Sequence, residues 1–146
     1  ALQSSANAID DKYLAEGTPT RKLLDEHTIS FIAFAPLAQG LMMGKYSKSN
    51  PPKFEPGDHR ANAPRFSPEN LAKLEPKIEK LKKQFGNTPE DLTRVALQYL
   101  LYYKQTAAVI PGFRNLEQVK INLSAAGKPL TQDEFTYIQS VFSEEK

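Results

Sequence analysis

Two short apolar runs, each followed by a proline, restrict the fold of this chain more than any other feature. The first run spans residues 29–34 and is ended by Pro36, and the second spans residues 107–110 and is ended by Pro111. Nearly continuous apolar character over so short a length is typical of buried parallel strands. Residues 1–3 offer the end of a possible third strand. Longer amphipathic stretches separate the runs, so the sequence predicts βαβ units, with a parallel sheet covered by helices.

Helix starts are marked by side chains that can cap an N-terminus. Threonine or serine precedes proline at residues 18–19, 67–68 and 88–89, which places a capping oxygen before a proline at the first helical position. Asn115 is a further cap, and residues 131–134 resemble a capping box. Apolar residues recur behind these starts at helical spacing. We expect the following side chains to be buried: Leu71, Leu74, Ile78, Leu81, Phe85, Leu92, Val95, Ala96, Tyr99, Leu100, Val119, Leu123, Phe135, Ile138 and Phe142.

Prolines also predict one irregular segment and one helix defect. Residues 45–66 show no periodicity and contain four scattered prolines, Pro51, Pro52, Pro56 and Pro64. A loop of about twenty residues is uncommon unless it is a functional lid or disordered. This loop follows the first full strand, on the side where α/β barrels bind ligands, so we expect a lid. Pro76 lies inside a helical pattern and should interrupt or kink the helix, because it removes a donor and clashes one turn back.

The charge distribution gives no support for a nucleic-acid partner. The 146 residues are 40% apolar and 25% charged, as in one packed domain, and the net charge is only +2. Lys80, Lys82 and Lys83 form a short basic cluster, but Glu75 and Glu79 lie beside it. This mixture favours a solvated helix face over a track for phosphates.

Several kinds of site are excluded by residue type. The chain has no cysteine, which removes disulfides, thiol nucleophiles and cysteine-based zinc sites. His27 and His59 lack partners at metal-ligand spacing, so we assign no metal site. No apolar run approaches the roughly 20 residues that cross a bilayer, and no secretory signal is visible. We therefore expect a cytoplasmic protein without a membrane partner.

Each predicted full strand ends in a turn that suits a phosphate. Residues 34–40 turn tightly with small side chains that let backbone approach a ligand, and Gly40 permits unusual dihedral angles. Gly112 and Arg114 precede a helix N-terminus, which favours anions, and arginine can pair with a phosphomonoester through two hydrogen bonds. A surface turn can show the same spacing, so spacing alone leaves both interpretations open. Three strands cannot close a barrel, so the rest of a barrel is missing or the chain pairs with something.

Two long motifs resemble the aldo-keto reductase family. Residues 31–46, FIAFAPLAQGLMMGKY, are similar to the seventh strand and following loop of that family. Residues 109–122, VIPGFRNLEQVKIN, are similar to its eighth strand and the helix after it. Residues 1–3 are similar to the end of the sixth strand, and residues 64–70 resemble the bacterial, potassium-channel-β-like branch.

The resemblance implies an α/β fold, a partial (β/α)8 TIM barrel that extends over residues 1–146. It would contain about the last three βα units, which are strands six to eight plus the C-terminal helix, with residues 45–66 as a cofactor-covering loop. The implied cofactor is NADPH. The implied cofactor-binding residues are Gln3, Phe34, Ala35, Pro36, Leu37, Ala38, Lys45, Gly112, Arg114, Gln118 and Asn122.

The resemblance also implies which part of the cofactor each of these residues would contact. Gln3 would hydrogen-bond the nicotinamide carboxamide and Phe34 would stack on its ring. Residues 35–38 would line the pyrophosphate and Lys45 would reach the phosphates. The 2′-phosphate would be held by Gly112 and Arg114, and the adenine would be contacted by Gln118 and Asn122. Two departures weaken the match: Ala35 replaces the usual serine, and Ile121 stands where many members carry glutamate.

Catalysis in the family uses an aspartate, a tyrosine, a lysine and a histidine from the first half of the barrel, and none of those motifs occurs here. We therefore assign no catalytic residue and expect the chain alone to be inactive. Our interpretation is the NADPH-binding C-terminal segment of a reductase that converts small aldehydes or ketones to alcohols by hydride transfer. The alternatives are a non-catalytic NADPH-binding regulatory subunit resembling potassium-channel β proteins and an inactive truncated fragment. Such a chain would pack as a homo-oligomer or against the missing barrel half.

Overall fold

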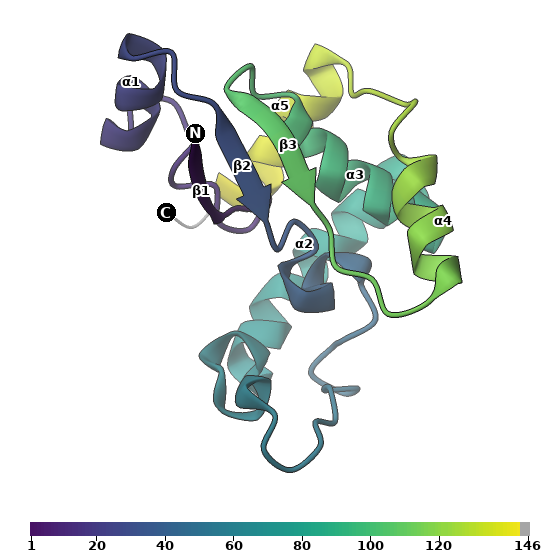
Figure 1. Cartoon of the computed structure of the whole chain (residues 1–146). Helices are drawn as coiled ribbons and strands as arrows, with labels where there is room; N and C mark the ends of the chain where they lie inside the picture. Colours follow the sequence, from purple (N-terminus) through teal and green to yellow (C-terminus); the bar gives the residue numbers. More distant parts are fainter. Residues whose placement is uncertain (144–146) are drawn as a thin grey trace.

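The computed structural model describes residues 1–143 and is built around a three-stranded parallel sheet (Figure 1). Its strands are β1 (Leu2–Ser5), β2 (Phe31–Phe34) and β3 (Thr106–Ile110), in the order β1-β2-β3. Ser5 is in register with Phe34, and Phe34 with Ile110. The loops that follow the three strands therefore leave from one edge of the sheet. The predicted α/β class and parallel sheet are confirmed, and the first strand extends two residues beyond the predicted residues 1–3.

The α-helices of the described chain begin where the sequence predicts. They are α1 (Pro19–Glu26), α2 (Pro68–Phe85), α3 (Pro89–Leu101), α4 (Leu116–Ser124) and α5 (Gln132–Ser143). The capping side chains accept from backbone N–H groups as expected, and they are Thr18, Ser67, Thr88 and Asn115. Before α5, the backbone N–H of Thr131 donates to the Glu134 carboxylate and the backbone N–H of Glu134 donates to the Thr131 hydroxyl. The predicted capping box is therefore confirmed.

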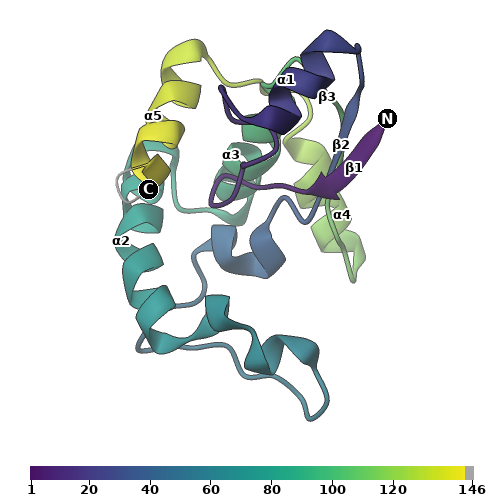
Figure 2. The same ribbon diagram turned by 90° about the vertical axis from the view of Figure 1, so that its left-hand side faces the viewer.

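The core lies on one side of the sheet, where α2, α3 and α5 gather (Figure 2). Phe31 and Ala33 point into it from β2 and are fully buried. Most of the predicted apolar helix positions are buried there, and Leu74, Phe85 and Val119 are half-buried. Leu123 is 67% exposed, so its predicted burial is wrong. It lies on α4, which buries none of its own residues.

A polar cluster is enclosed within this core. The hydroxyls of Tyr99 and Tyr103 donate to Oδ2 of Asp11 at 2.6 Å and 2.8 Å. Burial raises the pKa of both tyrosines above the ordinary value. Both phenols therefore stay neutral at physiological pH, and the cluster ties the segment after β1 to α3. It satisfies buried polar groups and lies apart from the strand-end turns.

The other face of the sheet is uncovered by the described residues. Phe34 is 41% exposed and Ile110 is 48% exposed, and both lie on this face. The described residues supply helices for one face only, so the burial that is typical of such apolar runs is incomplete, as expected of three strands that do not close a barrel. The expected open edges are present, since β1 and β3 each pair with β2 alone within residues 1–143.

Pro76 lies inside α2 without interrupting it. The helix runs unbroken from Pro68 to Phe85. Pro76 is exposed, whereas Leu71 and Ile78 before and after it are buried. The interruption that proline favours is absent because the buried face on both sides holds the helix together. The carbonyl that loses its donor belongs to Ala72, one turn back, and Ala72 is itself exposed.

Candidate functional site

The shared edge of the sheet brings together the two turns that the sequence singles out. Phe34 ends β2 and Ile110 ends β3, and the two residues are register partners in adjacent parallel strands. The proline turn and the Gly112–Arg114 turn therefore leave the sheet side by side, as predicted. Gln3 pairs with Ile32, two residues before Phe34. Since side chains alternate along a strand, Gln3 and Phe34 lie on the same open face.

The turn after β2 has an unusual backbone. Ala35, Ala38 and Gln39 have φ values of 55°, 48° and 57°, in the left-handed region. Each such residue costs on the order of 1 kcal/mol when it is not glycine. The turn is closed by hydrogen bonds from the Ala38 N–H to the Ala35 carbonyl and from the Gly40 N–H to the Leu37 carbonyl. Concentrated backbone strain is typical of sites that bind a ligand through main-chain groups.

An unsatisfied acceptor lies in the same turn. The Oε1 atom of Gln39 is buried and has no hydrogen-bond partner among the described residues. Buried polar atoms are nearly always hydrogen-bonded, so an orphan acceptor here is consistent with a group that the protein binds. No sequence pattern distinguishes Gln39 from its neighbours in this turn.

Lys45 lies beside the proline turn. Its Cε atom is 3.2 Å from the point that a Cβ atom on Gly40 would occupy, so its stem folds back over that glycine. Its Nζ atom is 4.9 Å from the centroid of the Tyr46 ring, close enough for a cation–π contact. The structure therefore places the cation of Lys45 at the turn where phosphate binding is expected.

The residues predicted after β3 form one hydrogen-bonded group. The Arg114 N–H donates to Oε1 of Gln118 at 2.7 Å. The Gln118 N–H donates to the Asn115 side chain at 2.9 Å, and Nδ2 of Asn122 donates to the Gly112 carbonyl at 3.4 Å. Gln118 and Asn122, which the resemblance assigns to adenine, thus hydrogen-bond to the backbone of this turn or to its cap. The Arg114 side chain is exposed and has no ion-pair partner within residues 1–143.

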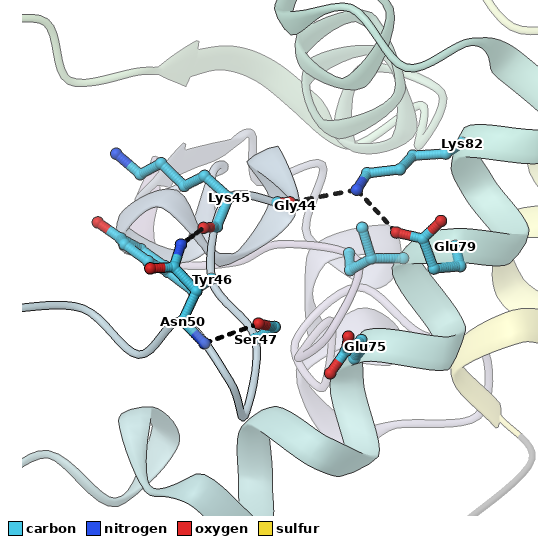
Figure 3. Close-up of a pocket in the computed structure, with 9 residues that line it drawn as sticks. Gly44, Lys45, Tyr46, Ser47, Asn50, Glu75, Glu79 and Lys82 are labelled. Atoms are coloured by element: carbon cyan, nitrogen blue, oxygen red, sulfur yellow. Dashed lines mark hydrogen bonds and ion pairs between the residues drawn. The ribbon is translucent and has the colours of Figure 1, made fainter.

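A polar hollow of about 270 Å³ lies between α2 and the chain from Gly44 to Asn50, at the start of the 45–66 loop (Figure 3). Lys82 lies at one end of it, and its amine donates to the Gly44 carbonyl at 3.2 Å. The amine of Lys45 points away from the hollow (Figure 3). The Lys82 side chain is only 23% exposed, so the predicted solvated helix face is wrong at this position.

The 45–66 loop is organised by its own side chains. Phe66 is buried and packs edge-on against Tyr46 and Phe54. Asp58 accepts several hydrogen bonds from Arg60, which hold the pKa of Asp58 well below its ordinary value. Two short 3-10 turns, His59–Asn62 and Pro64–Phe66, complete the loop. The loop extends beyond the carboxyl edge of the sheet (Figure 1). Its role as a lid stays a prediction.

Residues 1–143 contain neither a metal-binding cluster nor a membrane-crossing helix. No group of three or more histidine, aspartate or glutamate side chains there is arranged to hold a metal ion. In the same range, no helix has both the length and the apolar character that a bilayer crossing needs.

Three parallel strands with helices on one face and turns leaving from one end have the arrangement of part of an α/β barrel. Residues 5–142 match the model of the aldo/keto reductase family. This chain therefore belongs to that family, and the resemblance of the two motifs is confirmed.

Individual relatives agree with the family match. The chain is 31% identical to the aldo-keto reductase str7 of Strobilurus tenacellus over 80% of its own length. It is 34% identical to the NADP(+) aldo-keto reductase yakc of Schizosaccharomyces pombe over 71% of its length. The glycerol dehydrogenase AKR11B4 of Gluconobacter oxydans matches 95% of the chain with a TM-score of 0.74 at 22% identity, which shows the fold.

The chain covers only part of each of these proteins. It spans 34% and 30% of the two curated relatives and 41% of the solved dehydrogenase. The matched fold is thus a piece of a larger barrel.

Proposed function

We propose that this chain is the NADPH-binding C-terminal segment of an aldo-keto reductase that reduces small aldehydes or ketones. In this assignment β1, β2 and β3 are strands six to eight, and α5 is the C-terminal helix. The observation that carries the proposal is the register of Phe34 with Ile110. It aligns the strained proline turn and the Arg114 turn, so that one phosphorylated dinucleotide can lie across both.

The residues present fit such a cofactor. The backbone of residues 35–38 can line the pyrophosphate, and Lys45 supplies a cation beside it. The orphan Oε1 of Gln39 is an acceptor that a donor on the cofactor would satisfy. The Arg114 side chain is exposed on the next turn, ahead of the N-terminus of α4, which favours anions.

The bound dinucleotide would supply a hydride for the carbonyl carbon of the substrate. The side chains of this chain would bind and orient. Phe34, exposed on the open face, would cover one side of the nicotinamide ring, and Gln3 would fix its carboxamide from the same face. The proton donor of the family has no counterpart here, so the segment alone would hold the cofactor without turning substrate over.

Arg114→Ala tests the proposal in the complete barrel protein that carries this chain. If Arg114 holds the 2′-phosphate, its loss should weaken NADPH binding about tenfold to a hundredfold and leave NADH nearly unchanged, because charge-assisted paired bonds are strong. Fluorescence titration with both nucleotides measures the two dissociation constants. Lys120→Ala, which removes an exposed cation on α4, the helix that follows Arg114, is the control and should change neither dissociation constant. Equal weakening of both nucleotides would remove Arg114 from this role.

A non-catalytic regulatory subunit is the second candidate. The observation that favours it is the resemblance of residues 64–70 to the potassium-channel-β-like branch. Both candidates bind NADPH, so they differ only in turnover. Oxidation of NADPH by the complete protein that depends on an added aldehyde or ketone supports the enzyme. Stable NADPH binding without such oxidation supports the regulatory subunit.

A further inference from the structure

The start of the 45–66 loop is clamped onto α2. Gly44 has φ 62° and lies against two side chains of that helix. A Cβ atom added to Gly44 would be 2.6 Å from Cε of Lys82 and 2.8 Å from Cγ2 of Ile78. Nonbonded approaches this short are essentially never made by a Cβ atom, and Ile78 is buried, so any larger residue at position 44 would force the loop and the helix apart.

Lys82 supplies the polar part of the clamp. Its amine donates to the Gly44 carbonyl at 3.2 Å and pairs with Glu79 at 2.7 Å (Figure 3). Glu79 is on the preceding turn of α2 and holds the amine in the direction of the loop. On the other side, Nδ2 of Asn50 donates to the Lys45 carbonyl at 3.1 Å. The peptide units before and after the α-carbon of Lys45 are therefore each held by a side chain.

These contacts determine where the Lys45 side chain can reach. Lys45 directly follows the clamped glycine, and its stem folds over Gly40 in the proline turn. Release of the Gly44 carbonyl would let the backbone at Lys45 move away from α2, and the cation would no longer be confined to the turn.

We propose that Lys82 is a positioning residue for dinucleotide binding, which holds Gly44 so that Lys45 is fixed beside the cofactor pyrophosphate. This inference rests on the proposed function. It assigns a role in affinity to a helix lysine that does not touch the cofactor. Since the pyrophosphate is common to both nucleotides, the effect of Lys82 should be equal for NADPH and NADH, unlike that of Arg114.

The test compares Lys82→Met and Lys82→Arg with Lys83→Met in the complete barrel protein. Lys83 is the next residue on α2 and is exposed, so it is a control of equal charge. Lys82→Met should weaken both nucleotides about threefold to tenfold, as expected for one lost hydrogen bond. Lys82→Arg, which keeps a donor and a charge, should restore most of the affinity. Lys83→Met should bind both nucleotides as the wild type does.

A double-mutant cycle separates positioning from general stabilisation. Adding Lys82→Met to Lys45→Met should weaken binding no further than Lys45→Met alone, because Lys82 acts through Lys45. Additive losses, or wild-type affinity in Lys82→Met, would overturn the inference while leaving the proposed function intact. If the wild type binds neither NADPH nor NADH, the proposed function itself fails.

Discussion

Gly44 is the residue whose substitution measures the contact between the loop and α2 most directly. Gly44→Ala adds a methyl group where Ile78 and Lys82 leave no space, and it does so at a positive φ. Ile78 is buried and cannot move aside cheaply. We expect the free energy of unfolding to fall by about 2–4 kcal/mol, from backbone strain and overpacking together.

Gly57→Ala is the matched control for this prediction. Gly57 has φ 86°, but a Cβ atom there would meet nothing within 4 Å. It should therefore show the backbone cost alone, on the order of 1 kcal/mol. Urea unfolding of both variants, followed by circular dichroism, gives the difference. Equal losses would mean that the contact of Gly44 with α2 contributes nothing.

At the scale of elements, Arg94 joins α3 to α5. Its guanidinium donates to the Glu134 carboxylate at 3.0 Å, and also to the carbonyls of Lys128 and Pro129 in the segment between α4 and α5. The hydrogen bond from Arg94 lowers the pKa of Glu134 below its ordinary value. The ionised carboxylate therefore stabilises the fold above the unfolded-state pKa, and this contribution is lost as pH falls through the lowered folded-state value.

Glu134→Gln tests this link because glutamine keeps the shape and can still serve the capping box. At pH 7 the variant should be less stable than the wild type by about 1 kcal/mol, since the pair is only partly buried. The gap should close as the pH falls through the lowered folded-state pKa of Glu134, where the carboxylate becomes protonated. Glu90→Gln, an exposed residue in the first turn of α3, is the control and should show a small gap. Urea unfolding midpoints measured from about pH 3 to about pH 7 give the stability gap of each variant. A gap for Glu134→Gln that persists at the lowest pH would contradict the charge-based explanation.

The elements also show which features a sequence can reveal. Helix starts could be predicted because a cap joins residues that are close in the sequence. The Thr88 hydroxyl accepts a hydrogen bond from the N–H of Asp91, three residues later. The exposure of Leu123 and Ile110 could not be predicted, because it depends on which other segments cover these side chains. The continuous helix at Pro76 follows from tertiary burial of its neighbours, which outweighs a local penalty.

The candidate site likewise has features that could be predicted from the sequence and features that could not. The common edge of the two turns was predictable, because adjacent parallel strands end on the same side. The role of Lys82 was hidden, because its contact with Gly44 joins residues that are 38 positions apart. In the sequence it looks like any lysine beside a glutamate on a helix surface.

At the scale of the whole molecule, the open sheet face presents apolar side chains to solvent. Phe34, Ile110 and Phe113 leave 41%, 48% and 64% of their surfaces exposed around the carboxyl edge. Both outer strands also keep one side free of pairing within the described chain. Unpaired edges and apolar patches favour association with another chain. We therefore expect the 146-residue chain on its own to self-associate and to bind the dye ANS.

Ile110→Lys decides whether this face drives the association. A charge placed on the open face should prevent dimers at concentrations where the wild type forms them, and should lower ANS fluorescence several-fold, because burial of an unpaired charge is costly. Sedimentation velocity measures the association, and circular dichroism checks that the fold is retained. Leu101→Lys is the control, since Leu101 is 41% exposed but ends α3, away from the open face. If Leu101→Lys prevents dimer formation and Ile110→Lys does not, the association surface lies on the helical side. The sheet face would then not be responsible.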